Sequence, residues 1–298
     1  MKIKFSIAAL IMMFSSNACA SNWVELDVLV HDEDGTPIES ADIRGLFITD
    51  EINNGVKRDS HRDVTNNEGM GKVAGEEEIY VDLVVSKAGY YQTTRRKVVN
   101  QEKRGLVDVL LRAKQNPIPM YAKATHILPI ILDEEFGYDF QVGDYVAPHG
   151  KGVVSDLLLK IRYTEKDFWN YDYYLSLRFS NEKDGLLPFY FENANSKFRS
   201  KYNAPLSGYV GKWNYKRIAR KGEKDDTNMD KRRNYFFRVR TVVDKNGDIQ
   251  SAHYGKIYGE FPSIIYYFNP ITNQRNIEFD PQQNLLHDLN VKEQARKP

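Results

Sequence analysis

A glycine-rich stretch at residues 137–152 gathers side chains that could do acid–base chemistry, namely Asp139, Asp144, His149 and Lys151. The two carboxylates and the imidazole are candidate groups for a hydrolase that acts on glycan or peptide. Loops held by a rigid sheet are where such groups usually act. The glycines do not link a strand to a helix, so a phosphate cradle is not supported. We favour the alternative, a structured connection whose glycines meet backbone requirements.

Aromatic side chains are a second source of function, because an exposed row of flat rings could stack on the apolar faces of sugars. The candidate contacts for such a ligand are Trp169, Trp213, Tyr215 and, from the glycine-rich stretch, Lys151. The two tryptophans stand near charged or loop residues. Tyrosine is also a preferred strand residue whose ring packs while its hydroxyl reaches water. Most of the aromatic residues are therefore expected in or beside the core.

Two charged segments have plainer interpretations. Asp244-x-Asn246-x-Asp248 has the oxygen spacing with which calcium-binding loops begin. Gly255 stands where the last calcium ligand should be, so a hairpin turn is favoured. The insert Lys216–Arg233 holds eight basic and four acidic residues. It could face an acidic glycan, a phosphate or a membrane surface, but mixed signs favour a solvated loop.

Specific enzyme templates are not found. The six histidines form no HExxH or other helical ligand pair, so no metal site is predicted. The sequence has no G-x-S-x-G, P-loop or dinucleotide fingerprint, and no cofactor is predicted. A catalytic triad assembled in space from distant residues stays open.

The elements expected to position these residues are strands. In the region after residue 120, alternating residues predict strands at 156–163, 173–179, 187–191, 235–243, 249–257 and 264–268. Sixteen of the 19 tyrosines lie beyond residue 113. A short tail at 284–294 carries the one hint of a helix. The prediction is a large, aromatic-rich antiparallel β domain.

The first part of the chain shows the same period of two. Inward faces are predicted for strands that carry Val24, Leu26, Val28 and Val30; Ala41, Ile43 and Phe47; Ile79, Val81, Leu83 and Val85; and Val107, Val109 and Leu111. Turns are predicted at Asp34-Gly35 and at Asn66–Gly69, with a loop around Asn53–Gly55. Short strands separated by turn signals over about 90 residues are typical of a β-sandwich.

The residues of this sandwich resemble a known family. The order Val28-x-Val30-x-Asp32-x-x-Gly35-x-Pro37-Ile38-x-x-Ala41-x-Ile43, then Thr65-x-x-x-Gly69 and Val84-x-x-Lys87-x-Gly89-Tyr90, is similar to the carboxypeptidase regulatory-like (transthyretin-like) module. The resemblance covers residues 23–112 and implies a non-catalytic accessory domain. It implies nothing about a substrate.

The chain begins with the pattern of a secretory signal. A basic start, an apolar run at Phe5–Phe14 and Ala18-x-Ala20 predict cleavage after Ala20. A lipoprotein signal acylated on Cys19, the single cysteine, is the second interpretation. No later stretch is long enough to predict a transmembrane helix. Cleavage would leave 40 basic and 41 acidic side chains, which gives no pull toward nucleic acid.

The sequence therefore predicts an exported two-domain all-β protein of the periplasm or extracellular space. The predicted parts are a signal peptide at 1–20, a sandwich at 21–113, a linker at 114–119 with two prolines, a β domain at 120–283 and a tail at 284–298. The favoured role is non-catalytic binding or structure, with a glycan or an envelope protein as partner. A hydrolase, or an accessory subunit that uses an open sheet edge, stays open. The oligomeric state is not predicted.

Overall fold

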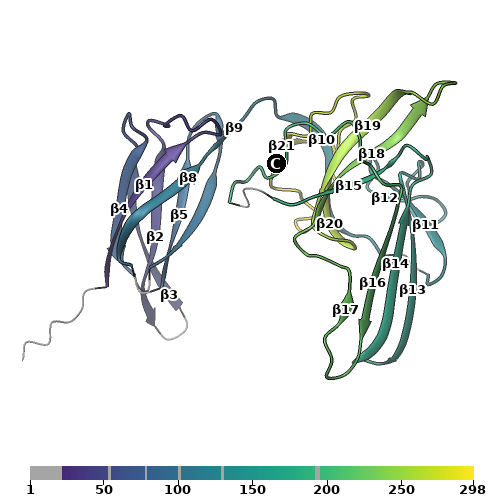
Figure 1. The fold of residues 1–298 in the computed structure, drawn as a ribbon, viewed down its shortest axis with the longest axis horizontal. Helices are drawn as coiled ribbons and strands as arrows, with labels where there is room; N and C mark the ends of the chain where they lie inside the picture. The colour runs from purple at the N-terminus through teal and green to yellow at the C-terminus, as the bar shows by residue number, and fades with distance from the viewer. Residues whose placement is uncertain (1–21, 53–54, 78, 100–101, 129–130, 192–194) are drawn as a thin grey trace, which may run out of the picture. The chain divides into compact units, whose positions relative to one another are not determined.

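The computed structural model describes residues 22–52, 55–77, 79–99, 102–128, 131–191 and 195–298 (Figure 1). These residues form strands, turns and irregular segments, so the prediction of an all-β chain is confirmed. Within these ranges, no helix has the length and apolar character needed to cross a membrane. The predicted signal peptide and its cleavage site at Ala20 lie outside the described residues, as do Asn53 and Asn54 of one predicted loop.

The chain divides into two compact units that differ from the predicted domains at their edges. Unit 1 holds residues up to Val30, Pro37–Val85 and Arg95–Val109. Unit 2 holds Leu110–Pro298 together with two short segments from the earlier chain, His31–Thr36 and Ser86–Thr94. The predicted linker is held within unit 2, because Glu278 accepts hydrogen bonds from the amides of Gln115 and Asn116. The separability of two domains stays a prediction.

Unit 1 is built on two described sheets, with strand orders β4-β1-β8 and β3-β2-β5-β7. The strands are β1 (Trp23–His31), β2 (Asp42–Ile52), β3 (Gly55–Val64), β4 (Met70–Glu76), β5 (Tyr80–Ser86), β7 (Thr93–Val98) and β8 (Arg104–Leu110). The predicted turns are present, since Gly35 and Gly69 both have positive φ.

Alternation places the core of unit 1 between its two sheets. The predicted inward residues of β1 are fully buried, from Val24 to Val30. The ring of Phe47 lies against the backbone of Gly75 across the sandwich, where a Cβ atom would be only 2.7 Å from the ring. Ile79 was predicted to point inward, but it lies just before β5 and is 59% exposed, so that prediction was wrong. The sandwich architecture itself is as predicted.

Unit 2 holds two larger sheets, with described strand orders β15-β18-β19-β20-β10-β21 and β12-β11-β13-β14-β16-β17. The first sheet has β10 (Ile118–His126), β15 (Gly185–Phe189), β18 (Asn234–Val243), β19 (Ile249–Tyr258), β20 (Ser263–Phe268) and β21 (Phe279–Asn284). The second has β11 (Glu135–Asp139), β12 (Asp144–Tyr145), β13 (Leu157–Asp167), β14 (Asn170–Arg178), β16 (Lys212–Ala219) and β17 (Asp226–Thr227). A short pair joins β6 (Tyr90–Tyr91) to β9 (Arg112–Ala113).

The sheet that contains β18, β19 and β20 is buried on both faces. One face packs on the second sheet through Tyr235, Phe237 and Tyr266. The opposite face carries a separate cluster that includes Phe236 and Tyr267. Covering both faces explains why β18 is an unbroken buried run over most of its length. It also creates a second, partly covered face on which a ligand site can form.

Two details of unit 2 correct the sequence analysis. The pair β10–β21 is parallel, so the domain is not entirely antiparallel. The tail at 284–294 forms no helix but runs beside β10, where Gln294 makes an isolated antiparallel bridge with Lys123. The amide of Ala124 donates to the carbonyl of Glu293, which fixes this tail along the sheet.

Candidate ligand-binding site

The glycine-rich stretch forms the small hairpin of β11 and β12, and its first carboxylate is fully engaged. Asp139 is 2% exposed. Its oxygens accept hydrogen bonds from the amides of Gln141, Val142, Val153 and Val154, at 2.9–3.2 Å. Four amide donors on one buried carboxylate fold the loop around it, so Asp139 supports the backbone.

Arg240 connects this loop to the neighbouring sheet. Its guanidinium binds both oxygens of the fully buried Asp156, at 2.7 and 3.0 Å, and donates to Asp139 at 3.0 Å. Burial would raise the pKa of Asp139, but the amide hydrogen bonds and Arg240 outweigh it and lower that pKa. Burial raises the pKa of Asp156 despite its bidentate contact with Arg240. The charges in this cluster satisfy one another.

The other predicted groups of the loop do not assemble into a catalytic set. Asp144 accepts hydrogen bonds from the amides of Tyr145 and Lys151, so it caps its own turn. The ring of His149 lies on Phe136, with centroids 4.4 Å apart, and its Nε2 is 3.6 Å from Glu134. The side chain of Lys151 is exposed. This geometry favours the structural interpretation of the loop.

The predicted aromatic contacts separate into three environments. Tyr215 is buried at 1% exposure and its hydroxyl bonds that of Tyr235, so its ring has no face for a ligand. Trp213 packs partly buried against the core, edge-on to Tyr235 at 5.5 Å. Trp169 is exposed beside Phe168 at the tip of the β13–β14 hairpin, with ring planes 87° apart. Perpendicular rings do not make a flat platform for a sugar.

One of the two charged segments folds as its plainer interpretation predicts, whereas the insert is not simply a loop, because its first residues belong to β16 and Asp226–Thr227 forms β17. Asp244 accepts the amides of Asn246 and Asp248 in a hairpin turn. Within the insert, ion pairs join Lys216 to Asp226 and Arg217 to Asp225. Among the described residues, no group of three or more His, Cys, Asp or Glu side chains could hold a metal ion.

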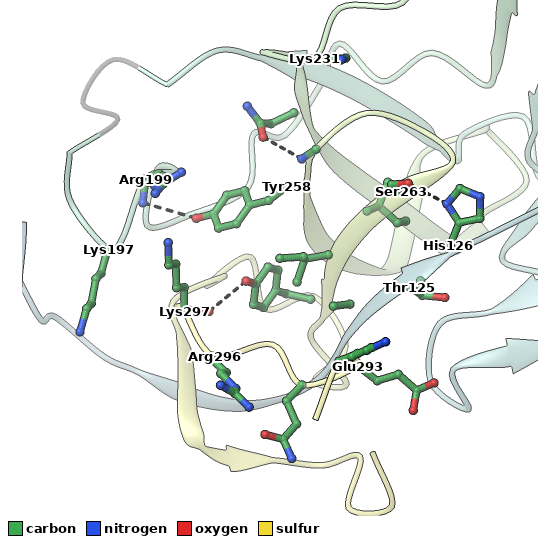
Figure 2. Close-up of a pocket in the computed structure, with 18 of the residues that line it drawn as sticks. Thr125, His126, Lys197, Arg199, Lys231, Tyr258, Ser263, Glu293, Arg296 and Lys297 are labelled. Atoms are coloured by element: carbon green, nitrogen blue, oxygen red, sulfur yellow. Dashed lines mark hydrogen bonds between the residues drawn. The ribbon is translucent and has the colours of Figure 1, made fainter. Parts of the chain in front are cut away.

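A pocket of about 1080 Å³ opens on the second face of the buried sheet (Figure 2). Strands β10, β19 and β20 provide its floor, and the tail provides one wall. Its charged lining residues come from distant segments and are Lys197, Arg199, Lys231, Lys292, Glu293, Arg296 and Lys297. The volume is slightly above the usual range for small-molecule sites.

Positive charge in this pocket lacks compensation from within the lining. Its one carboxylate, Glu293, is paired with Lys123 at 3.1 Å. In the described part of the chain, no acidic side chain pairs with Lys197, Arg199 or Lys297. Burial lowers the pKa of Lys297, and the positive charges of Arg199 and Lys197 lower it further. Several cations that repel one another around a cavity are arranged to receive an anion.

Aromatic rings and a buried lysine lie behind the cationic end. Tyr258 is edge-on to Phe191 and to Tyr267, with centroids 5.3 Å away in both cases. Beneath these rings, the ammonium of the fully buried Lys256 lies 5.0 Å from Tyr258 and 4.9 Å from Tyr267. Burial lowers the pKa of Lys256 well below its ordinary value, although Glu278 opposes this effect. Any charge that Lys256 keeps adds to the positive potential of the pocket floor.

The opposite end of the pocket is polar and carries the carboxylate of Glu293 (Figure 2), which is paired with Lys123. His126 and Ser263 lie across from Lys297 and Arg199 in Figure 2. The hydroxyl of Ser263 is 2.7 Å from His126 Nδ1. A hydroxyl and an imidazole offer both donors and acceptors to a ligand. The pocket therefore has a cationic end and an opposite end that offers hydrogen bonds.

Sequence reasoning did not predict this pocket, and none of the individually predicted site residues line it; only Lys231 comes from the insert for which an acidic glycan was considered. The lining residues come from several short segments spread between Ala124 and Lys297, and no local motif joins these segments. One signal was present, because Lys256 alternates with Tyr254 and Tyr258 along β19. A charged residue in phase with buried aromatic ones indicates a specialised face.

Comparisons with known proteins add little to this description. Models of known protein families gave no match, and neither did the curated protein sequences. One solved structure with similarity is "a putative carbohydrate binding protein from Bacteroides uniformis ATCC 8492", which is 10% identical. The match covers 84% of this chain and 98% of that chain with a TM-score of 0.20. A similarity this low carries no argument about fold or function.

Proposed function

We propose that this chain is an exported, non-catalytic binding protein that captures an anionic ligand in the pocket of unit 2. The observation that supports this most directly is that Lys197, Arg199 and Lys297 surround one cavity without an acidic partner among the described side chains, although Arg199 also donates to the carbonyl of Ser196 and lies over the ring of Phe191. An anion placed there would relieve their mutual repulsion. The glycine-rich loop supports the non-catalytic part of this proposal. Its buried carboxylate, Asp139, already accepts hydrogen bonds from backbone amides and from Arg240.

Export is the part of the proposal that rests on sequence alone. The basic start, the apolar run and Ala18-x-Ala20 support cleavage before residue 21 and release from the cytoplasm. The sandwich of unit 1 fits the accessory role that its resemblance to the transthyretin-like module implies. Mass spectrometry that found an intact Met1 on the native protein would contradict export.

Titration calorimetry with tripolyphosphate, a probe of charge alone, tests the pocket. We expect binding that weakens as salt is added, because ionic contacts with exposed groups are screened. Lys297→Gln and Arg199→Gln should each raise the Kd about tenfold or more, since hydrogen bonds to charged groups contribute about 1.5–3 kcal/mol.

Lys151→Gln is the matched control, because it removes an exposed lysine of unit 2 that does not line the pocket. Its Kd should equal that of the unmodified protein. An equal loss in Lys151→Gln and Lys297→Gln would show nonspecific attraction, and the proposal would fall. Absence of binding to any anion would contradict it as well.

A further inference from the structure

The two ends of the pocket differ in chemistry, which restricts the ligand beyond its charge. Lys197, Arg199 and Lys297 gather at one end. At the other end the side chains of His126 and Ser263 are exposed, and Ser263 uses only part of its hydrogen-bonding capacity on His126. A ligand that fills both ends needs an anionic group on a neutral body rich in hydroxyls.

We infer that the ligand is an acid-bearing oligosaccharide, held with its acidic group at the cationic end and its sugar hydroxyls against His126 and Ser263. This inference rests on the proposed function, since it names the chemical class of the anion. A uronic acid sugar joined to neutral sugars combines the two chemistries in one molecule. The cavity of about 1080 Å³ has room for more than one small ring system.

An acidic peptide fits this pocket less well. Peptides commonly bind by adding a strand to a free sheet edge. The strands of the floor have neighbours, because β20 lies between β19 and β10, and β10 lies between β20 and β21. Further along β10, past its pairing with β21, the amide of Ala124 donates a hydrogen bond to the carbonyl of Glu293. The floor therefore offers side chains rather than an unpaired backbone.

A single-stranded nucleic acid also fits poorly. Such ligands need open ring faces on which successive bases stack. The plane of Tyr258 makes angles of 75° with Phe191 and 66° with Tyr267, so each neighbour meets it edge-on. Lys256 lies behind the rings of Tyr258 and Tyr267. Tyr267 is also fully buried, so the rings of this pocket offer no row of open faces on which bases could stack.

The test compares three probes by titration calorimetry on the full mature chain. They are a trisaccharide with one terminal uronic acid, the methyl ester of the same trisaccharide, and tripolyphosphate. We expect the ester to bind at least about tenfold more weakly than the acid, because it loses the charge and keeps the body. An ester that bound as tightly as the acid would overturn the inference.

Ser263→Ala separates the sugar body from the charge. It should weaken binding of the acidic trisaccharide about threefold to tenfold and leave tripolyphosphate unchanged, since a neutral hydrogen bond is lost only for the sugar. Ser176→Ala, an exposed serine on β14 outside the pocket lining, is the matched control and should change neither. Lys297→Gln should weaken both ligands.

The outcomes distinguish this inference from the proposal beneath it. If tripolyphosphate binds through Lys297 while Ser263→Ala has no effect on the trisaccharide, the anion site stands and the carbohydrate assignment is overturned. If none of the three probes binds, both fail. Circular dichroism of each variant checks that the fold is retained, which we expect because the side chains of Ser176, Ser263 and Lys297 are all exposed.

Discussion

The glycine-rich loop and the pocket are both rich in charge, and they differ in what satisfies that charge. In the loop, Asp139 and Asp156 receive backbone amides and the guanidinium of Arg240. In the pocket, Arg199 and Lys297 have no acidic partner among the described side chains. A charge that is satisfied within the fold contributes to structure, whereas an unsatisfied one is available to a ligand. Residue type alone does not separate these two cases.

The largest expected effect is on stability, in the loop. Arg240→Ala should lower the free energy of unfolding by about 3–5 kcal/mol, because it leaves the buried carboxylates of Asp139 and Asp156 without their cation. Urea denaturation measures the loss. Arg162→Ala, which breaks the exposed pair with Asp133, is the control and should cost about 0–1 kcal/mol. If Arg240→Ala cost as little as this control, the charges of the loop would not be stabilising the fold, and the contrast between the loop and the pocket would be wrong.

The tryptophans extend the comparison to apolar side chains. Trp213→Ala should cost about 3 kcal/mol, at the low end for an aromatic core residue, because its ring is only partly buried against Tyr235. Trp169→Ala should change stability by less than about 0.5 kcal/mol, since its ring is exposed. Neither lines the pocket, so anion affinity should be unaffected in both. Thermal unfolding and calorimetry check both outcomes.

This expectation for Trp213 replaces the one that the sequence suggested. From sequence, Trp213 is a ligand contact near charged residues. In the structure, the ring of Trp213 packs against the core, and the guanidinium of Arg233 lies 5.9 Å from its centroid. Loss of ligand binding in Trp213→Ala without loss of stability would restore the earlier interpretation.

A smaller effect depends on pH. The pKa of Asp139 is lower in the folded state than in the unfolded chain, so its ionised form stabilises the fold above about pH 4. The contribution is lost as the pH falls through the folded pKa. Asp139→Asn should therefore be about 1–3 kcal/mol less stable near pH 7, because its amide donors lose a charged acceptor.

The stability difference between Asp139→Asn and the unmodified protein should shrink as the pH falls below about 4. Urea denaturation at a series of pH values measures it. A difference that stays constant across this range would mean that the carboxylate charge is not what holds the loop. The same series on Lys297→Gln should show no such convergence, since that residue is not acidic.

Much of the fold could be predicted from the sequence, because strands produce an alternation of apolar and polar residues that is visible over a few neighbouring positions. The alternation from Val24 to Val30 fixes which side of β1 is buried. The turns at Gly35 and at Gly247 follow from short motifs that need positive φ. The prediction of buried residues failed where the apolar pattern extends past a strand. Ile79 is apolar but lies outside β5 and is exposed.

Only the tertiary structure decided which charged residues share a site. Lys197 and Lys297 are a hundred positions apart, and they converge because the tail runs beside β10 and is held there through Glu293 and Gln294. The role of Asp139 was equally hidden, since its partner Arg240 lies on a strand about a hundred residues later. Alternation is a property of neighbouring residues and can be read locally. Whether a charged side chain is paired depends on residues that are distant in the sequence and meet only in the folded chain, so no local pattern predicts it.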